Sequence, residues 1–262
     1  MKAVILCGGR GTRMKEETEF KPKPLVNIGK MPMLWHIMKI YSHYGVKEFI
    51  LCLGYKGEMI REYFLRYNEL INDFTLNLSS EKDKAITIHG ALEKRDDWKI
   101  TFVDTGKENM TGSRIAQIKK YIGDDEDFFL TYGDGLSDIN LNELYKFHKS
   151  KGKIATLTAV KPFSYFGIIE TENNLVKSFQ EKPIIEGTIN GGFFVCNKKI
   201  FNYLDKAPSC VFEQEPLKNL TKEGQLASFH HNGFWFAMDT PKHAETLNNM
   251  IGSGNTPWVV WN

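Results

Sequence analysis

Cysteine is scarce in this sequence, and long apolar runs are missing. Only four of the 262 residues are cysteine, and no two of them form a C-x-x-C pair. A disulfide framework is therefore disfavoured, and we expect Cys7, Cys52, Cys196 and Cys210 to be free, buried thiols in a reducing compartment. No segment supplies the roughly 20 apolar residues of a membrane helix, and the first apolar run is too short for a secretory signal. These absences predict a soluble, cytoplasmic protein without a membrane partner.

An excess of charge of either sign is also missing. The 34 lysine and arginine residues balance 32 aspartate and glutamate residues, which leaves a formal net charge of +2. This balance argues against a protein whose main function is to bind nucleic acid. There is no internal repeat and no glycine- or serine-rich linker, so we expect a single domain over residues 1–262.

Short apolar runs alternate with amphipathic ones through residues 1–160. Apolar residues at helical spacing between Pro32 and Gly45 predict a helix, and similar patterns recur further along the chain. This alternation predicts right-handed crossovers and a mostly parallel sheet covered on both faces. The strands are expected at residues 3–7, 49–53, 100–103, 128–132 and 154–160, and the further helices at residues 59–67, 115–122 and 141–149.

The pattern changes after residue 160, where strand-like pieces follow one another with fewer helices between them. We therefore expect an α/β core over residues 1–160 and a smaller, more antiparallel appendage over residues 161–262. Ligands of such sheets bind outside the carboxyl ends of the strands. The strand-like pieces are residues 74–78 and 85–89 within the core, and 166–170, 175–180, 192–196, 225–229, 234–238 and 258–261 after it.

A glycine-rich loop follows the first expected strand. Residues 7–13 read Cys-Gly-Gly-Arg-Gly-Thr-Arg, so bare backbone amides and two arginines are available for phosphate oxygens. The loop is not a dinucleotide fingerprint, because Met14 stands where the third glycine is required. It is not a Walker A loop either, because no Gly-Lys-Ser/Thr follows. Ten residues further on, Pro22 and Pro24 flank Lys23 and are expected to hold it in an extended segment.

The glycine-rich loop followed by Pro-Lys-Pro resembles the signature of the sugar-1-phosphate nucleotidyltransferases. The resemblance covers the whole chain, and Cys7 departs from it where relatives usually carry alanine. It implies the Rossmann-like nucleotide-diphospho-sugar transferase fold, with the nucleotide bound by residues 1–160 and the sugar by the appendage. The further matching segments are residues 103–106, 110–114, 132–135, 179–183, 190–194, 213–216 and 233–240.

The reaction that the resemblance implies is CTP plus glucose 1-phosphate giving CDP-glucose and diphosphate, in the synthesis of dideoxysugars for the O-antigen of lipopolysaccharide. UTP, dTTP or another sugar 1-phosphate remains an alternative, as does a nucleotide-sugar sensor without catalysis. Lys23, Arg13 and Asp134 are the implied catalytic residues, and Asp134 and Asp239 would hold Mg²⁺. The implied nucleotide-binding residues are Leu6, Cys7, Gly8, Gly9, Arg10, Gly11, Thr12, Arg13, Lys23, Asn109, Thr111, Gly112, Arg114 and Gly133, and the implied sugar-phosphate-binding residues are Glu181, Lys182, Asn190 and Gly191.

Several of these residues have a competing structural explanation. Asp239 precedes Thr240 and Pro241 and could cap a helix, and Asp138 is a weaker metal candidate that fits a helix cap better. We expect His230 and His231 to be an ordinary pair at a strand edge. The aromatic residues 258–261 are expected to dock on the domain or on a second subunit. The resemblance implies a homo-oligomer, with a hexamer as its expected form.

Overall fold

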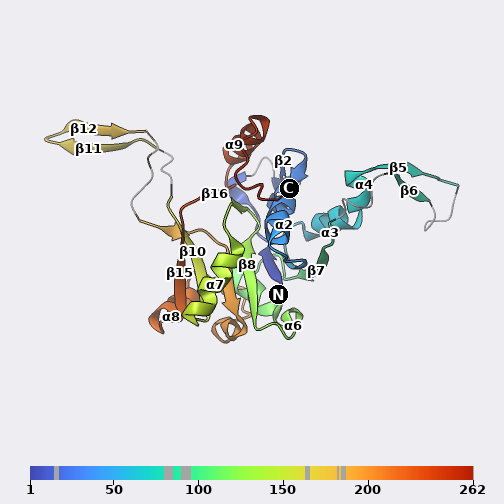
Figure 1. Ribbon diagram of the computed structural model, residues 1–262, viewed down its shortest axis with the longest axis horizontal. Coiled ribbons are helices and arrows are strands. Elements are labelled where there is room, and N and C mark those ends of the chain that lie inside the picture. Colours follow the sequence, from blue (N-terminus) through green and yellow to red (C-terminus); the bar gives the residue numbers. More distant parts are fainter. Residues whose placement is uncertain are drawn as a thin grey trace.

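A β-sheet forms the centre of the protein (Figure 1), and the residues of its inner strands are almost all buried. The computed structural model describes residues 1–14, 18–79, 85–89, 96–162, 166–181, 183 and 187–261. All four residues of β1 (Ala3–Leu6) are buried, and the strand lies between β4 (Glu48–Leu53) and β8 (Asp127–Tyr132), parallel to both. Buried parallel strands have apolar side chains on both faces, which is why β1 lacks an alternating pattern.

The central sheet has eight strands and is mixed. Its order is β13-β10-β14-β8-β1-β4-β7, with β15 on β10. The pairs β8–β1, β1–β4 and β4–β7 are parallel, as predicted for an α/β core. The pair β10–β15 is also parallel, although β15 lies in the part of the chain where antiparallel strands were expected. The later strands mostly extend this same sheet, β14 antiparallel to β8 and to β10. The added strands are β7 (Lys99–Asp104), β10 (Ala155–Val160), β13 (Ile189–Asn190), β14 (Phe194–Asn197) and β15 (Leu226–His231).

Strands β13 and β14 are two parts of one interrupted strand. Both pair antiparallel with β10, through Val160 opposite Ile189 and Ala155 opposite Cys196. Between them Gly192 and Phe193 have positive φ angles of 74° and 45°. A left-handed conformation costs little at glycine but is uncommon at phenylalanine. The ladder is interrupted at residues 191–193, directly after Asn190, at the edge where ligands of such sheets bind.

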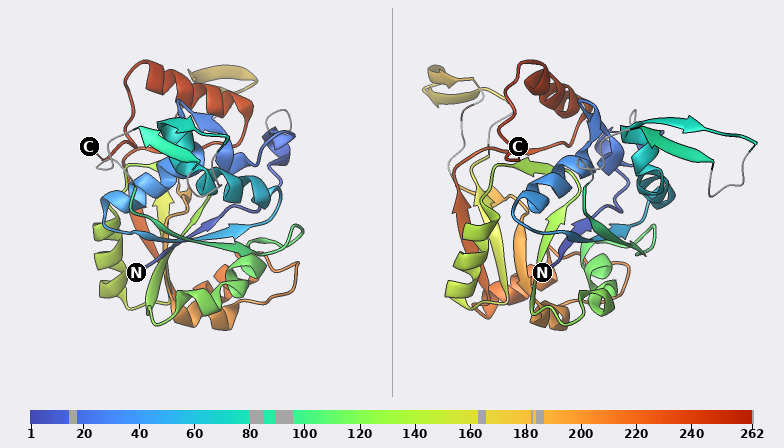
Figure 2. Two further views of the ribbon diagram at one scale, coloured as in Figure 1. Left: turned by 90° about the vertical axis from the view of Figure 1, so that its right-hand side faces the viewer. Right: turned by 45° about the vertical axis from the view of Figure 1, so that its right-hand side comes forward.

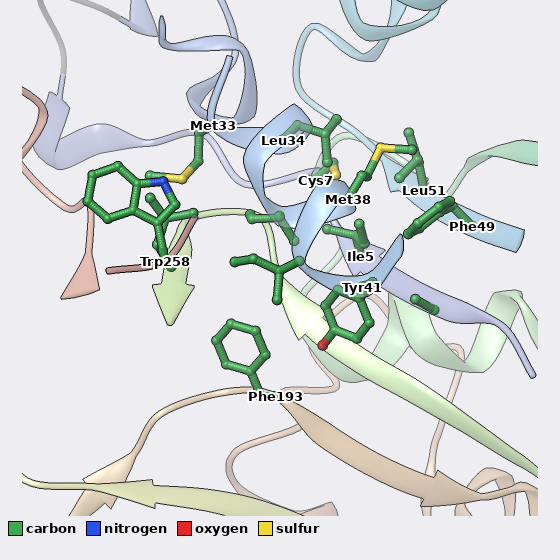
Figure 3. Close-up of a cluster of buried hydrophobic side chains, with 14 of the residues drawn as sticks. Ile5, Cys7, Met33, Leu34, Met38, Tyr41, Phe49, Leu51, Phe193 and Trp258 are labelled. Carbon is green, nitrogen blue, oxygen red and sulfur yellow. The ribbon is translucent and has the colours of Figure 1, made fainter. Parts of the chain in front are cut away.

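Helices cover both faces of the sheet, and a hydrophobic cluster lies on each face. One cluster joins Ile5 and Phe129 to residues of the helix after Pro32 and to Trp258 (Figure 3). The other joins Val4 and Phe128 to residues on the opposite side. Neighbouring strand residues therefore point to opposite faces. The helices are α2 (Met33–His43), α3 (Gly57–Leu65), α4 (Tyr67–Ile71), α5 (Thr111–Gln117), α6 (Lys119–Ile122), α7 (Leu141–Lys151), α8 (Glu215–Lys222) and α9 (Pro241–Gly252).

Two antiparallel hairpins project from the body of the protein (Figures 1 and 2). One pairs β5 (Asp73–Leu76) with β6 (Ile86–His89), and the other pairs β11 (Ile168–Glu172) with β12 (Leu175–Gln180). Smaller pairs lie against the body: β2 (Asn27–Ile28) with β3 (Met31–Pro32), and β9 (Gly135–Ser137) with β16 (Trp235–Ala237).

The structure departs from the predicted elements in a few places. The helix predicted at 59–67 is divided into α3 and α4 at Arg66. The strand predicted at 258–261 is wrong: these residues form no strand, although Trp258 is buried and contacts His36, so the expected docking on the domain is confirmed. Cys7, Cys52 and Cys196 are buried free thiols, and Cys210 is free but half-buried. No helix of the described ranges is long and apolar enough to cross a membrane.

Candidate active site

Three separate parts of the chain bring Lys23, Asp134 and Asp239 together at the carboxyl edge of the sheet. Asp134 follows β8 by two residues, and Lys23 begins the 3-10 helix η2 (Lys23–Leu25). Asp239 arrives through the pairing of β16 with β9, in which Ala237 lies opposite Gly135. The amide of Met238 then donates to the carbonyl of Asp134 at 2.9 Å, which places the two aspartates side by side.

The ammonium group of Lys23 lies between the two carboxylates. Its Nζ is 2.6 Å from Oδ2 of Asp134 and 2.8 Å from Oδ1 of Asp239. Arg13 reaches the other oxygen of Asp239 at 3.3 Å. Burial lowers the pKa of Lys23, but the two aspartates outweigh burial and raise that pKa above its usual value. Burial acts in the opposite sense on Asp239, whose pKa is nevertheless lowered by Lys23 and Arg13.

The segment around Lys23 is turned rather than extended, which corrects the prediction for Pro22–Pro24. Only Pro22 is extended, with φ −66° and ψ 148°, and the amide of Leu25 donates back to its carbonyl. Pro24 has no amide hydrogen to lose at the second position of a 3-10 turn. The prolines therefore fix a tight turn, from which the side chain of Lys23 reaches the carboxylates.

The glycine-rich loop leaves the end of β1 beside these residues. Gly11 has a φ of 61°, and its carbonyl accepts from the hydroxyl of Thr18. Gly9 has no atom within 4 Å of the place that a Cβ would take, so its backbone is open to a ligand. Arg10 forms an ion pair with Glu108. A cavity of about 330 Å³ beside the loop is lined by Arg10, Thr12, Thr18, Glu19 and Tyr55.

Arg114 supports the glycine-rich loop through hydrogen bonds to backbone carbonyl oxygens. Its side chain is buried, and its guanidinium donates to the carbonyl oxygens of Gly8, Leu53 and Gly106 and to the hydroxyl of Thr105, at 2.8–3.0 Å. A Cβ at Gly8 would overlap this guanidinium. The sequence predicts a nucleotide contact for Arg114, whereas these contacts favour an indirect role, because its donors are directed at the backbone of the loop.

The remaining residues expected to bind nucleotide lie on the same edge, in mostly structural surroundings. The amide of Gly133 donates to the carbonyl of Leu6 at 3.1 Å, and Asn109 donates to the carbonyl of Thr105. Gly112 packs against Cys210. The thiol of Cys7 is buried, and burial raises its pKa well above the usual value, so it is an inert packing group.

A hydrogen-bonded group beside Asp134 contains two residues that were not predicted. Glu213 accepts from the hydroxyls of Thr111 and Tyr132, each at 2.6 Å. Tyr132 in turn accepts from Nδ2 of Asn190 at 3.2 Å. The sequence contains two glutamates in the segment 213–216, and local pattern does not show which of them turns toward the sheet. Tyr132 could have been proposed from the sequence, because it precedes Gly133, which was expected to bind nucleotide.

The residues expected to bind the sugar phosphate are only partly described. Asn190 and Gly191 lie at the break between β13 and β14, where Trp235 donates to the carbonyl of Gly191 at 2.7 Å. Glu181 follows β12 at the base of the projecting hairpin and is exposed. Lys182 lies outside the described residues. The structure therefore brings Asn190 and Gly191 to the carboxyl edge.

Two competing explanations for aspartates are wrong. Helix α9 is capped by Thr240, whose side chain accepts from the amide of His243, so Asp239 is not the cap. Helix α7 is capped by Asn140, and Asp138 instead lies 2.9 Å from Nε2 of His231. His231 is the last residue of the edge strand β15, as expected for an ordinary histidine.

A second polar cavity, of about 360 Å³, lies at the opposite edge of the sheet. It is lined at the amino end of β8 by the buried Asp127, which accepts from Lys149 and Asn197, each at 2.9 Å. Nδ1 of His148 forms a hydrogen bond with the hydroxyl of Thr156 at 2.9 Å. The polar groups that line this cavity are therefore paired with one another.

The fold and the site define a class of protein. A largely parallel α/β sheet presents a glycine-rich loop, a lysine and two aspartates at its carboxyl edge, as α/β proteins that bind phosphorylated ligands do. Within this class the family model for nucleotidyl transferases matches residues 2–249, and the chain belongs to that family.

Similar proteins support the assignment to this family. The chain is 52% identical over 261 residues to the "Probable glucose-1-phosphate cytidylyltransferase" of Bacillus subtilis, with all of both chains covered. It is 45% identical over 262 residues to the glucose-1-phosphate cytidylyltransferase of Salmonella typhi, again over all of both chains. The crystal structure of HddC from Yersinia pseudotuberculosis has the same fold, with a TM-score of 0.69 at 23% identity, covering 95% of this chain and 99% of that one.

Proposed function

We propose that the protein transfers a cytidylyl group from CTP to glucose 1-phosphate. Two observations support this activity: the placement of Lys23 between Asp134 and Asp239 beside the glycine-rich loop, and the full-length relatives with that name. The phosphate oxygen of the sugar attacks the α-phosphorus of CTP. The bond from that phosphorus to the β-phosphate breaks, and diphosphate leaves.

The chief obstacle to this reaction is the repulsion between two anions. Unit charges about 4 Å apart interact by about 4 kcal/mol at an effective dielectric constant of 20. We expect Arg13 and the backbone amides of the glycine-rich loop, where Gly9 is open, to bind the departing phosphates. Lys23, which lies closest to the aspartates, neutralises charge at the reacting phosphorus. No protein nucleophile is needed, because the site works by positioning and by charge neutralisation.

Nucleotidyltransferases generally use a divalent metal ion, and Mg²⁺ fits the residues present. The carboxylates of Asp134 and Asp239 share the ammonium group of Lys23, so a positive charge is already held at the place where Mg²⁺ would bind. The described residues contain no group of three or more His, Cys, Asp or Glu side chains suited to a metal. Two carboxylates with substrate phosphates and waters suit Mg²⁺. When bound, the ion would neutralise and orient the triphosphate.

Asn190, Gly191 and Glu181 are the proposed contacts of the sugar phosphate, together with Lys182. Asn190 and Gly191 lie next to each other where the strand is interrupted, and Nδ2 of Asn190 donates to the hydroxyl of Tyr132 at the end of β8. A sugar hydroxyl can both donate and accept, so an amide side chain beside bare backbone suits it. The product would be a CDP-hexose of the kind used in dideoxysugar synthesis.

The test is an assay of diphosphate release with Mg²⁺ and glucose 1-phosphate, run in parallel with CTP, UTP and dTTP. We expect CTP to give the highest kcat/KM. Preference for another nucleotide would refute the proposed specificity for cytosine, but nucleotidyl transfer to a sugar 1-phosphate would still be the reaction. Tight binding of nucleotide without turnover of any pair would identify a nucleotide-sugar sensor and refute catalysis.

We also propose that copies of the chain associate, a hexamer being the form that the family resemblance implies. The hairpin β11–β12 supports association, because Ile169, Leu175, Val176 and Phe179 are between 53% and 72% exposed on it. Exposed apolar side chains on a projecting hairpin are typical of contact surfaces. Light scattering of the purified chain measures the mass, and a monomer at micromolar concentration would refute the proposal.

A further inference from the structure

Four side chains form a hydrogen-bonded chain between the nucleotide and sugar parts of the proposed site. Thr111, at the start of α5, donates to Oε2 of Glu213, and Tyr132, at the end of β8, donates to Oε1. Nδ2 of Asn190 donates to the hydroxyl of Tyr132. The four residues come from α5, β8, β13 and the segment before α8, so only the tertiary structure joins them.

The carboxylate of Glu213 determines the direction of every hydrogen bond in this chain. Carboxylate oxygens accept and do not donate, so both hydroxyls must turn their hydrogens toward Glu213. The oxygen of Thr111 is then free to accept from the amide of Phe212, which lies 2.9 Å away.

The backbone amide of Gly192 and the hydroxyl of Tyr132 together orient the side-chain amide of Asn190. Its Oδ1 accepts from the amide of Gly192 at 3.0 Å, which leaves its nitrogen facing Tyr132. One hydrogen of that nitrogen goes to Tyr132, whose oxygen can accept it because the hydroxyl hydrogen points to Glu213. Within the described part of the chain the second hydrogen has no further partner. It remains available for an acceptor oxygen on a ligand.

We propose that Glu213 is a positioning residue for the sugar phosphate. By ordering Tyr132, it makes Asn190 present an N–H donor to an oxygen of that substrate. The inference rests on the proposed function, in which Asn190 contacts the sugar phosphate. Glu213 itself is not proposed to contact the substrate, because its two carboxylate oxygens accept from Tyr132 and Thr111.

Glutamine at position 213 separates this role from simple packing. Its size is nearly that of glutamate, but one acceptor oxygen becomes an NH₂ group that only donates. The Glu213→Gln protein can therefore accept from Thr111 or from Tyr132, but not from both. If Tyr132 reverses its hydroxyl, the oxygen no longer fixes the nitrogen of Asn190. Glu215→Gln is the matched control, because Glu215 lies in the same segment and faces Lys218 at 3.8 Å.

The experiment measures steady-state kinetics with each substrate varied in turn. We expect Glu213→Gln to raise KM for glucose 1-phosphate about ten-fold, the cost of one misdirected hydrogen bond. KM for CTP should stay within about two-fold of wild type. Tyr132→Phe should have the same selective effect. The double variant should show no further loss, because both changes break one chain. Glu215→Gln should match wild type.

Other outcomes overturn the inference. Equal increases in KM for both substrates, or an additive loss in the double variant, would show that Glu213 acts only on overall structure. An unchanged KM for glucose 1-phosphate would show that it does not order Asn190. If wild type uses another nucleotide or sugar phosphate, the proposed substrates fail, and Glu213 is tested with the pair that is used. Absence of turnover with every pair overturns both proposals.

Discussion

The ammonium nitrogen of Lys23 lies 2.6 Å from Oδ2 of Asp134, although 111 positions separate the two residues in the chain. The same nitrogen lies 2.8 Å from Oδ1 of Asp239. A single protein cation therefore occupies the space between the two carboxylates. Any ligand cation that binds there must share or replace this contact, and any phosphate that draws Lys23 away leaves both carboxylates exposed to a cation.

Replacement of Lys23 should abolish most of the catalysis. We expect Lys23→Ala to lower kcat by about two to three orders of magnitude, the usual effect of removing one donor that stabilises the transition state. Diphosphate release at saturating substrates measures this. Lys30→Ala, at an exposed lysine after β2, is the control and should match wild type. Undiminished kcat in Lys23→Ala would remove Lys23 from the mechanism.

Removal of the same lysine should strengthen metal binding to the protein without nucleotide. In Lys23→Ala the carboxylates of Asp134 and Asp239 lose their common cation, so we expect Mn²⁺ to bind at least about ten-fold more tightly than to wild type. Electron paramagnetic resonance of free Mn²⁺ gives the dissociation constant directly. Equal affinity in both proteins would mean that the ion binds elsewhere.

The two aspartates should differ from Asp138 in their effect on metal dependence. We expect Asp134→Asn and Asp239→Asn each to raise the Mg²⁺ concentration for half-maximal activity by at least about ten-fold, because each removes one anionic ligand. Asp138→Asn should leave it unchanged, since Asp138 pairs with His231. A wild-type Mg²⁺ titration in both of the first two variants would contradict the assignment.

Two neighbouring glycines should respond differently to alanine. A Cβ at Gly8 meets the guanidinium of Arg114, whereas a Cβ at Gly9 meets no atom within 4 Å. Gly8→Ala should therefore lower the free energy of unfolding by about 1–3 kcal/mol, and Gly9→Ala should change it by less than about 0.5 kcal/mol. Urea unfolding measures both. Both variants should raise KM for CTP, and equal stabilities would show that Arg114 does not pack against Gly8.

His36 should make folding sensitive to acid. Burial lowers its pKa despite the hydrogen bond to the carbonyl of Ile28, and its Nδ1 accepts from Trp258. The unfolded chain therefore takes up this proton first, and stability is lost as the pH falls below the unfolded pKa of about 6.5. Glutamine cannot titrate in this range. We therefore expect His36→Gln to reduce the dependence of the free energy of unfolding on pH, by up to about 1 kcal/mol per pH unit between pH 5 and 6.5.

The control for this prediction is His43→Gln. His43 is an exposed histidine at the end of the same helix. Its replacement should leave the pH dependence of unfolding as in wild type. Equal slopes for wild type and His36→Gln, measured by urea unfolding at several pH values, would refute the role of His36.

Local pattern predicted most of the framework. The buried run in β1, the alternation of strands and helices, and the loop after β1 are visible in the sequence because each depends on neighbouring residues. The prediction of a strand at residues 258–261 was wrong because it rested on a short aromatic run. Apolar residues in a short run indicate burial, and they do not distinguish a strand from an irregular segment that packs on the core.

The sequence by itself determined the class of fold, the position of the glycine-rich loop and the supply of Lys23, Asp134 and Asp239. Only the tertiary structure decided how these groups meet. The pairing of β16 with β9 sets Asp239 beside Asp134, the enclosure of Arg114 turns its donors to the loop backbone, and Glu213 joins Tyr132 across a long stretch of chain. Side-chain direction depends on what packs around each residue, and contacts between distant segments leave no periodic trace in either segment.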